Sequence, residues 1–177
     1  MLGLIPGTVT LSDYDPQWPE DFRREAERLL NATSSGPDHG PIKEIAHIGS
    51  TSIPGMMAKP MIDMMVGLHT LGDVAALIPI LNRMGYDYKG EFGIPDRHFF
   101  TLGNPTTHHV HMVFHDGPFW KLNLLFRNHL RAHPPEAAAY VALKRELAAK
   151  FANNRESYTK GKDAFIRSML ARAGWRG

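Results

Sequence analysis

The sequence contains no cysteine in its 177 residues. This absence excludes disulfide bonds, zinc–thiolate sites, iron–sulfur clusters and a thiol nucleophile, so any metal site must use histidine and carboxylate ligands. The sequence also lacks a run of about 20 apolar residues, the length that a membrane-spanning helix needs. The first ten residues, MLGLIPGTVT, have no basic start and no long apolar core, as a signal peptide would. We therefore expect a cytoplasmic protein that does not bind membranes.

The sequence also lacks a large excess of charge of one sign. The chain has 20 Lys and Arg against 18 Asp and Glu, a net charge of +2 with neutral histidine. This excess is too small for sequence-independent binding of a long nucleic acid through electrostatics alone. The C-terminal third is basic, however, which favours a small phosphorylated ligand. The length and the 43% of apolar residues fit a single domain over residues 1–177.

The spacing of apolar residues predicts a mixture of helices and strands. Apolar residues at helical spacing predict a helix over 19–31, a Gly/Ser/Pro-rich loop follows over 33–41, and alternation predicts a strand over 42–48. The almost wholly apolar run 60–68 is typical of a central strand. Further strands are expected over 86–89, 97–102 and 108–114, and helices over 74–84, from 117 to about 130, over 134–151 and around 165–170. The fold class is α+β: a small mixed β-sheet flanked by helices, with a basic helical C-terminal part from about residue 117 that closes one side of a cleft.

The first candidate site follows the strand 42–48. The chain turns there through Gly49, Ser50, Thr51 and Ser52. Glycine lets a ligand approach the backbone closely, and the amide and hydroxyl groups of such a turn can hold an anion. The alternative is an ordinary turn, because the same residue types dominate turns in general.

The second candidate is Asp63, the one charged residue in the run 60–68. A carboxylate that is buried without a partner commonly costs several kcal/mol, so it needs a hydrogen bond, a cation or a metal ion. In a purely structural role its partner would be Lys59 or Arg97. In a functional role Asp63 holds a divalent ion beside an anion that is bound at Gly49 and Ser50.

Histidines are concentrated in one further segment, since four of the 10 fall between residues 108 and 115. On a strand, His109, His111 and His115 share one face with Val113. Two imidazoles on one face can bind a transition metal, or a phosphate when they are protonated. The alternative is a pair of partly exposed histidines without a ligand. A histidine-triad hydrolase is disfavoured, because Val113 stands where the third histidine would be.

Cations in the C-terminal part are candidate phosphate contacts. Arg127 and Arg131 are four residues apart and so lie on one side of a helix. Lys162 would point at a ligand if the last helix folds back over the sheet. Together with Lys59, Arg127 and Lys162 are expected to contact phosphates, because an anionic ligand needs cations opposite it. The alternative is that these residues are solvated surface charges.

Residues 47–67, HIGSTSIPGMMAKPMIDMMVG, closely resemble the signature of the GrpB family. Four shorter pieces agree with this resemblance in the same order: YDPQWP at 14–19, HVH at 109–111, FRNHLR at 126–131 and YTKGK at 158–162. Members of the family look like distant relatives of the nucleotidyltransferases. The resemblance therefore implies a nucleotidyltransferase-like fold over most of the chain.

In nucleotidyltransferases a Gly-Ser pair binds the nucleotide phosphates, and two carboxylates one residue apart on the next strand hold Mg²⁺ ions that activate the attacking hydroxyl. By this resemblance Gly49, Ser50 and Asp63 occupy matching positions. Met65 stands at the second carboxylate, and a thioether is no substitute for a hard oxygen ligand. The resemblance also implies that His109 and His111 border Asp63 and replace the missing acidic ligands, around Mg²⁺, Mn²⁺ or a transition metal.

Two functions follow from these features. The first is binding of a nucleotide or another small phosphorylated ligand with a divalent cation, extended to nucleotidyl transfer to an unknown acceptor if a further acid such as Glu91, Asp96 or Asp116 completes the site. The second is a non-catalytic module that assists the folding or action of a partner protein, because relatives of this domain occur fused to dephospho-coenzyme A kinase. Met65 favours the second function, and the histidine pair favours the first.

Overall fold

The computed structural model describes residues 2–34 and 40–176 and contains one five-stranded sheet of strand order β1-β2-β5-β4-β3. In the described chain β2 and β5 run parallel, and the other neighbouring strands pair antiparallel. The sheet is therefore mixed, as the sequence predicts. The strands are β1 (Ile42–Ile48), β2 (Ile62–Leu68), β3 (Tyr86–Tyr88), β4 (His98–Leu102) and β5 (His108–Phe114). The helices are α1 (Trp18–Thr33), α2 (Val74–Arg83), α3 (Pro118–Ala132), α4 (Pro134–Lys150), α5 (Arg155–Gly161) and α6 (Asp163–Arg172), with the short 3₁₀ turns η1 (Ser50–Ser52) and η2 (Leu71–Asp73).

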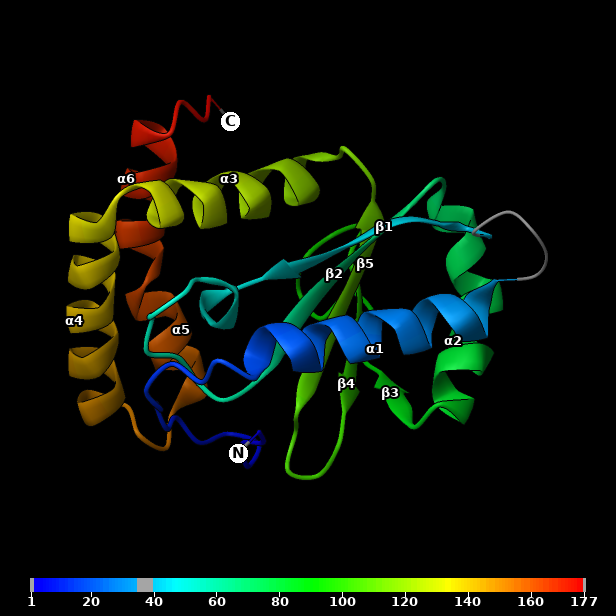
Figure 1. Cartoon of the computed structure of the whole chain (residues 1–177), viewed down its shortest axis with the longest axis horizontal. Coiled ribbons are helices and arrows are strands. Elements are labelled where there is room, and N and C mark those ends of the chain that lie inside the picture. Colours follow the sequence, from blue (N-terminus) through cyan, green and yellow to red (C-terminus); the bar gives the residue numbers. More distant parts are fainter. Residues whose placement is uncertain (1, 35–39, 177) are drawn as a thin grey trace.

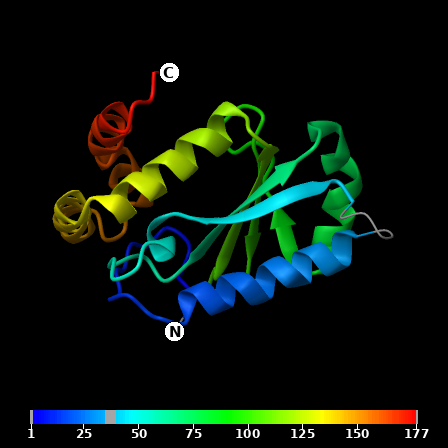
Figure 2. The ribbon, with the colours of Figure 1, turned by 45° about the horizontal axis from the view of Figure 1, so that its top comes forward.

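Helices cover both faces of the sheet (Figures 1 and 2). Helix α1 crosses one face, α3 lies on the other, and α4, α5 and α6 stand together beyond the end of the sheet at which β1 finishes. Because side chains alternate along a strand, Met64 and Val66 of β2 enter the core under α1 and α2, whereas Met65 enters the smaller core under α3. Asp63 lies on the same face as Met65, at the end of β2 nearest the C-terminal helices.

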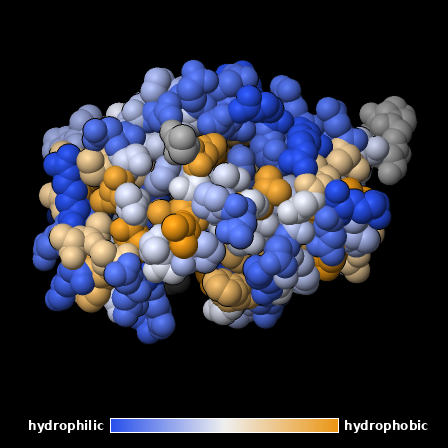
Figure 3. All heavy atoms as spheres, turned by 90° about the horizontal axis from the view of Figure 1, so that it is seen from below, coloured by the Kyte–Doolittle hydropathy of each residue, from blue (hydrophilic) through white to orange (hydrophobic). Residues whose placement is uncertain are grey.

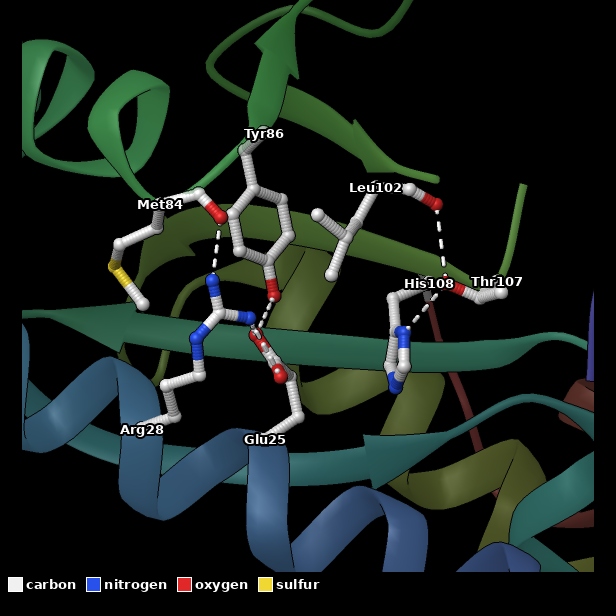
Figure 4. A network of polar contacts seen from close by, with 7 residues as sticks. All are labelled: Glu25, Arg28, Met84, Tyr86, Leu102, Thr107 and His108. Carbon is white, nitrogen blue, oxygen red and sulfur yellow. Dashed lines mark hydrogen bonds and ion pairs between the residues drawn. The ribbon is translucent and has the colours of Figure 1, made fainter. Parts of the chain in front are cut away.

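Hydrogen bonds to the buried carboxylate of Glu25 connect α1 to β3, an edge strand of the sheet (Figure 4). The hydroxyl of Tyr86 donates a hydrogen bond of 2.6 Å to Glu25, and Arg28 donates bonds of 2.8 and 3.0 Å to the two oxygens of the same carboxylate. Arg28 also reaches the carbonyl oxygen of Met84. These bonds offset the desolvation of Glu25, and they fix α1 against β3.

Strands β2, β3 and β4 are one or two residues shorter than predicted, and two larger differences concern helices. Helix α1 continues to Thr33, the first residue of the predicted loop 33–41, and residues 35–39 of that loop lie outside the described residues. The short helix α5 has no counterpart among the predicted elements, because Tyr158 is its one buried residue and gives no helical pattern. Strands β1 and β5 have the predicted bounds.

Hydrophobic side chains do not form a continuous band on the face that Figure 3 shows; they form small groups among hydrophilic ones. None of the helices in the described parts of the chain combines the length and the apolar character that crossing a membrane requires.

Candidate functional site

The turn after β1 brings Gly49 against Asp63. The antiparallel register pairs Ile48 with Asp63, so the next residue, Gly49, lies beside the carboxylate. A Cβ atom at Gly49 would lie 2.7 Å from Asp63 Oδ2, and the φ angle of Gly49 is 70°, which L-residues with a side chain rarely adopt. Both facts require glycine here. The glycine thus leaves room for the carboxylate itself.

The parallel pairing of β2 with β5 sets Asp63 opposite His109 and Met65 opposite His111. His109 Nδ1 lies 2.9 Å from Asp63 Oδ1, and His111 Nε2 lies 3.7 Å from the same oxygen. Burial alone would raise the pKa of Asp63, but its hydrogen bonds with His109 and then His111 hold it well below its ordinary value. Asp63 is therefore ionised at neutral pH.

The structure gives Asp63 histidine partners in place of the cations that a purely structural role predicts. Within the described residues, neither Lys59 nor Arg97 forms an ion pair with Asp63. The Arg97 guanidinium instead donates hydrogen bonds to the backbone carbonyls of Glu91 and Phe92, at 3.0 and 2.9 Å. Arg97 thus holds the loop between β3 and β4 together.

The second ring nitrogen of His109 faces Arg155 of α5. Arg155 Nη2 lies 3.3 Å from His109 Nε2. A guanidinium only donates hydrogen bonds, so Nε2 accepts, and in neutral His109 the proton is on Nδ1 and points to Asp63. Burial lowers the pKa of the neighbouring His111, whose Nδ1 has no hydrogen-bond partner among the described residues. The neutral form of His111 is thus favoured, and its Nε2 is the nitrogen on the side of Asp63.

Asp63, His109 and His111 form a candidate metal centre. Each offers one ligand atom, and these atoms lie within 4.8 Å of one another. One carboxylate oxygen with two imidazole nitrogens suits Mn²⁺, Zn²⁺ or a similar transition ion better than Mg²⁺, which prefers oxygen ligands throughout. The three residues therefore fit a metal ion, provided that His109 gives up its Nδ1 proton.

Met65 shows why a second carboxylate is missing at this site. Its side chain is fully buried and packs with Ala46, Ile48, Val113 and Trp120 in the core under α3. The position two residues after Asp63 is thus filled by apolar packing and does not face a ligand. The other acids that the sequence suggests as ligands lie outside the pocket.

Glu91 accepts a hydrogen bond of 2.7 Å from the backbone amide of Asp96, and Asp116 contacts His115 and Lys43 at 2.9 and 3.5 Å. In the part of the chain that the structure describes, Asp63 is the one carboxylate that lines the pocket around it.

This pocket has a volume of about 530 Å³ and lies between the end of the sheet and the C-terminal helices. Its lining is rich in cations, among them Lys59, Lys144, Arg155 and Lys162. Burial, strengthened by the charge of neighbouring cations, lowers the pKa of both Lys59 and Lys144 to about 7, and burial also lowers the pKa of Lys162. The pocket therefore brings several cationic side chains together with one carboxylate, Asp63, and the charged form of its lysines is destabilised there.

The lysines are held by specific contacts. Lys144 Nζ donates a hydrogen bond of 3.1 Å to Ser50 Oγ and another to the carbonyl of Met57. Lys59 and Lys162 both lie over the ring of Tyr158, at 5.8 and 4.7 Å from its centroid. These contacts direct three ammonium groups from different elements into one pocket.

The pocket brings together most of the residues that the sequence suggests. Its lining includes Gly49, Ser50, Thr51, Lys59, Asp63, His109, His111 and Lys162. Ser52 and Arg127 are not in the lining. The Ser52 hydroxyl donates to the carbonyl of Gly49 at 2.6 Å, and Arg127 Nη1 donates to the carbonyl of His47 at 2.8 Å. Both residues therefore stabilise the backbone of the turn.

Other predicted neighbours also have supporting contacts. Arg131 donates to the carbonyl of Ser52, as Arg127 does to that of His47, so both arginines brace the turn from α3. The Thr51 hydroxyl lies 3.0 Å from His47 Nε2 and 3.3 Å from the carbonyl of Met61.

The sequence interpretation counts Lys144 only among the basic residues of the C-terminal helices that could contact a phosphate, and it does not include Arg155. Lys144 stands between Tyr140 and Leu147 on the buried stripe of α4. A lysine on an otherwise apolar helical stripe is the signal that could have identified it. Arg155 begins α5, which the sequence pattern does not predict.

Aromatic rings form the outer edge of the pocket. Phe99 lies with its ring centroid 5.0 Å from those of both His109 and His111, and Phe92 stacks on Phe99 at 5.3 Å. Phe92 is 68% exposed and has a φ angle of 48°. Such a backbone conformation is costly for an aromatic residue and is often found at binding sites. A second cavity, of about 1020 Å³, is also lined by Phe92, Phe99 and His109.

Comparisons with known proteins show the family of the chain and several similar proteins. The model of a family described as "GrpB protein" matches residues 8–172. The UPF0157 protein YqkA of Bacillus subtilis is 43% identical over 156 residues, which are 88% of this chain and 44% of that protein. The glutamate-rich protein GrpB of Alkalihalophilus pseudofirmus is 35% identical over 176 residues, 96% and 98% of the two chains. This chain thus spans less than half of YqkA but nearly all of the second relative.

Other similar chains are longer or more distant. A dephospho-CoA kinase of Mycolicibacterium paratuberculosis is 26% identical over 204 residues, covering 95% of this chain and 48% of that protein. The crystal structure of conserved protein GrpB from Enterococcus faecalis has a TM-score of 0.84 and 36% identity, and covers 93% of this chain and 96% of that one.

A terminal uridylyl transferase 4 from Trypanosoma brucei with bound CTP has a TM-score of 0.52 and 13% identity, over 92% of this chain and 52% of that one. At this identity the likeness concerns the fold alone. The predicted nucleotidyltransferase-like fold is confirmed.

Proposed function

The chain belongs to the GrpB family, and we propose that its pocket binds a nucleotide, or another small phosphorylated ligand, together with a divalent cation. The observation that carries this proposal is the excess of cationic side chains over carboxylates in the pocket. Lys59, Lys144, Arg155 and Lys162 line it with Asp63 as the one carboxylate, within the described residues. Buried cations without a counter-ion are unfavourable, and strongly perturbed pKa values of this kind cluster at binding sites. A polyphosphate supplies the missing negative charge.

The phosphates would contact the turn after β1 and the ammonium groups around it. Ser50 is held by Lys144 from α4, so the hydroxyl and the ammonium group present donors to the same region. Lys59 and Lys162 both lie over the Tyr158 ring, at 5.8 and 4.7 Å from its centroid. Asp63, His109 and His111 would hold the divalent cation, which neutralises phosphate oxygens when it is bound. This arrangement uses the glycine turn and Asp63 in the way that the resemblance to nucleotidyltransferases implies.

The aromatic edge favours a nucleotide over a bare phosphate. One face of the Phe92 ring lies against Phe99, and the side chain is 68% exposed. Stacking of a base on an aromatic side chain is worth about 1–3 kcal/mol and tolerates every base. The uridylyl transferase of similar fold holds CTP, a nucleoside triphosphate. We therefore expect triphosphate binding with weak discrimination between bases.

Nucleotidyl transfer is the catalytic extension of this proposal. In such a step an acceptor hydroxyl loses its proton, its oxygen bonds to the α-phosphorus, and the bond to the leaving pyrophosphate breaks. The second cavity shares His109 with the pocket. Its volume of about 1020 Å³ leaves room for an acceptor. Met65 removes one of the two carboxylates that the usual two-metal mechanism needs. Binding is therefore the primary proposal.

A non-catalytic role on a partner protein is the second candidate. It is favoured by the packing of Met65, which leaves Asp63 without a second acid at the metal centre. The match to about half of a protein named dephospho-CoA kinase is consistent with a module that assists another domain. In this role the chain would bind its partner whether or not a nucleotide is present.

Thermal-shift measurement with tripolyphosphate and with each nucleoside triphosphate, with and without Mn²⁺ or Mg²⁺, tests the proposal. A ligand that binds only the folded chain raises the melting temperature. We expect a shift that is larger with Mn²⁺ than without a metal ion in the wild type. Lys162→Met should lose the shift, whereas Lys121→Met, which removes an equal charge from the exposed surface of α3, should keep it.

Two further variants separate the parts of the site. Asp63→Asn should remove the effect of Mn²⁺ while it leaves binding of the metal-free ligand. Phe92→Ala should weaken nucleotide binding and leave tripolyphosphate binding unchanged. No shift with any of these ligands would favour the role on a partner protein.

A further inference from the structure

A second cluster of potential metal ligands lies outside the pocket, where α3 passes into α4. His129 is in the last turn of α3, His133 joins the two helices, and Glu136 is in the first turn of α4. One ligand atom from each residue lies within 4.8 Å of the others. None of the three residues lines the pocket that contains Asp63. The cluster is therefore a separate feature of the C-terminal helices.

Hydrogen bonds orient the two imidazoles in this cluster. His133 Nδ1 lies 2.8 Å from the backbone carbonyl of His129. The carbonyl only accepts, so the proton of neutral His133 is on Nδ1 and Nε2 keeps its lone pair. A backbone carbonyl that accepts from the non-ligating nitrogen is the usual support of a metal-binding histidine. The two rings stack with centroids 4.1 Å apart, and His129 Nε2 points to Glu136 Oε2.

Glu136 supplies the negative ligand. Its Oε1 accepts a hydrogen bond of 2.7 Å from Arg172 of α6, which leaves Oε2 on the side of His129. The bond from Arg172 thus orients the carboxylate before a metal ion arrives, through its second oxygen.

We propose that His129, His133 and Glu136 form a second metal site, which binds Zn²⁺ or a similar transition ion and fastens α3 to α4. Two nitrogens and one oxygen are a ligand set typical of Zn²⁺, with the fourth position open to water because His133 is exposed. Arg172 extends the link to α6. Helix α4 carries Lys144, α5 carries Arg155, and Lys162 lies between α5 and α6, so this site stabilises the helices that close the pocket.

The test is metal binding in the full chain with the pocket site removed. Asp63→Asn is titrated with Co²⁺, whose visible absorption reports tetrahedral coordination, and its melting temperature is measured with Zn²⁺. We expect one ion per chain, and a melting temperature that rises with Zn²⁺ concentration. Adding His133→Ala should abolish both signals, whereas adding His69→Ala, which removes another exposed histidine, should change neither.

Two results would overturn the proposal: no Co²⁺ signal in Asp63→Asn, or a signal that survives His133→Ala. Because His133 is exposed, its replacement leaves the packing of α3 and α4 in place. The outcome is independent of the proposed function. If the pocket binds no metal, the wild type still takes up one ion, and His133→Ala still removes it.

Discussion

Ligand binding should be linked to pH through the two lysines whose pKa values are about 7. Burial is the main cause of the low pKa of both Lys59 and Lys144, and nearby positive charges add to it. For Lys144 the fall from 10.5 to about 7 corresponds to about 5 kcal/mol against the charged form. A polyphosphate in the pocket reverses the effect of the neighbouring charges and raises both pKa values. Binding of the ligand must then be accompanied by uptake of protons.

The magnitude follows from these values. At pH 7 each lysine is about half protonated in the free protein, so binding takes up about one proton, and this number approaches about two near pH 8.5. Affinity is greatest below pH 7 and falls by up to about 100-fold per pH unit once both lysines are neutral.

Stability of the free protein should change in the opposite direction. The unfolded chain holds more protons on these lysines between pH 7 and 10.5, so the free energy of unfolding rises with pH in that window.

Calorimetric titration with tripolyphosphate from pH 6 to 9, in buffers of different ionisation enthalpy, measures both affinity and proton uptake. The same titration of Lys144→Met, which loses one titrating group, allows the protonation of the ligand itself to be subtracted. Affinity that is independent of pH, or equal proton uptake in the wild type and Lys144→Met, would refute the assignment of these lysines to the binding site.

Three further predictions concern the framework of the site. Gly49→Ala should lower the free energy of unfolding by about 1–3 kcal/mol and displace the Asp63 carboxylate, because the new Cβ lies 2.7 Å from Asp63 Oδ2. Urea unfolding measures the loss of stability, and loss of the Mn²⁺ effect reports the displaced carboxylate. Tyr86→Phe should lower the free energy of unfolding by about 1.5–3 kcal/mol, because it removes a buried hydrogen bond to the charged Glu25. Ligand affinity should not change. Met65→Asp should lower the free energy of unfolding by several kcal/mol, because the new carboxylate enters an apolar core. Thermal unfolding should then lose its cooperativity, and a stable variant with stronger Mn²⁺ binding would contradict this packing argument.

The strands could be predicted closely because their apolar patterns are strong. Strands β1 and β5 have the expected bounds, and the neighbourhood of Asp63, His109 and His111 follows from the resemblance that sets β2 beside β5. His115 follows the end of β5 and lies on the same face as His111, as expected: it contacts Glu44 at 3.1 Å, and its ring centroid lies 4.5 Å from that of Trp120 in α3. His115 does not line the pocket that contains Asp63.

The cations of the site could be predicted only in part. Which side of a helix faces a pocket depends on how the helix packs, and the spacing of Arg127 and Arg131 does not contain that information. In the structure α3 packs against the sheet so that Arg127 reaches the carbonyl of His47 in β1 and Arg131 reaches that of Ser52 in the turn after it. Lys144 carries a sequence signal in its apolar stripe, whereas Arg155 carries none, since the short helix that positions it depends on tertiary contacts.

The most direct test of the account is a calorimetric titration of the wild type and Lys162→Met with a nucleoside triphosphate in the presence of Mn²⁺. The account predicts saturable binding of one nucleotide per wild-type chain, at least tenfold weaker binding to Lys162→Met, and unchanged binding to Lys121→Met. Absence of binding to the wild type, or equal affinity in all three proteins, would contradict the claim that this pocket binds nucleotides.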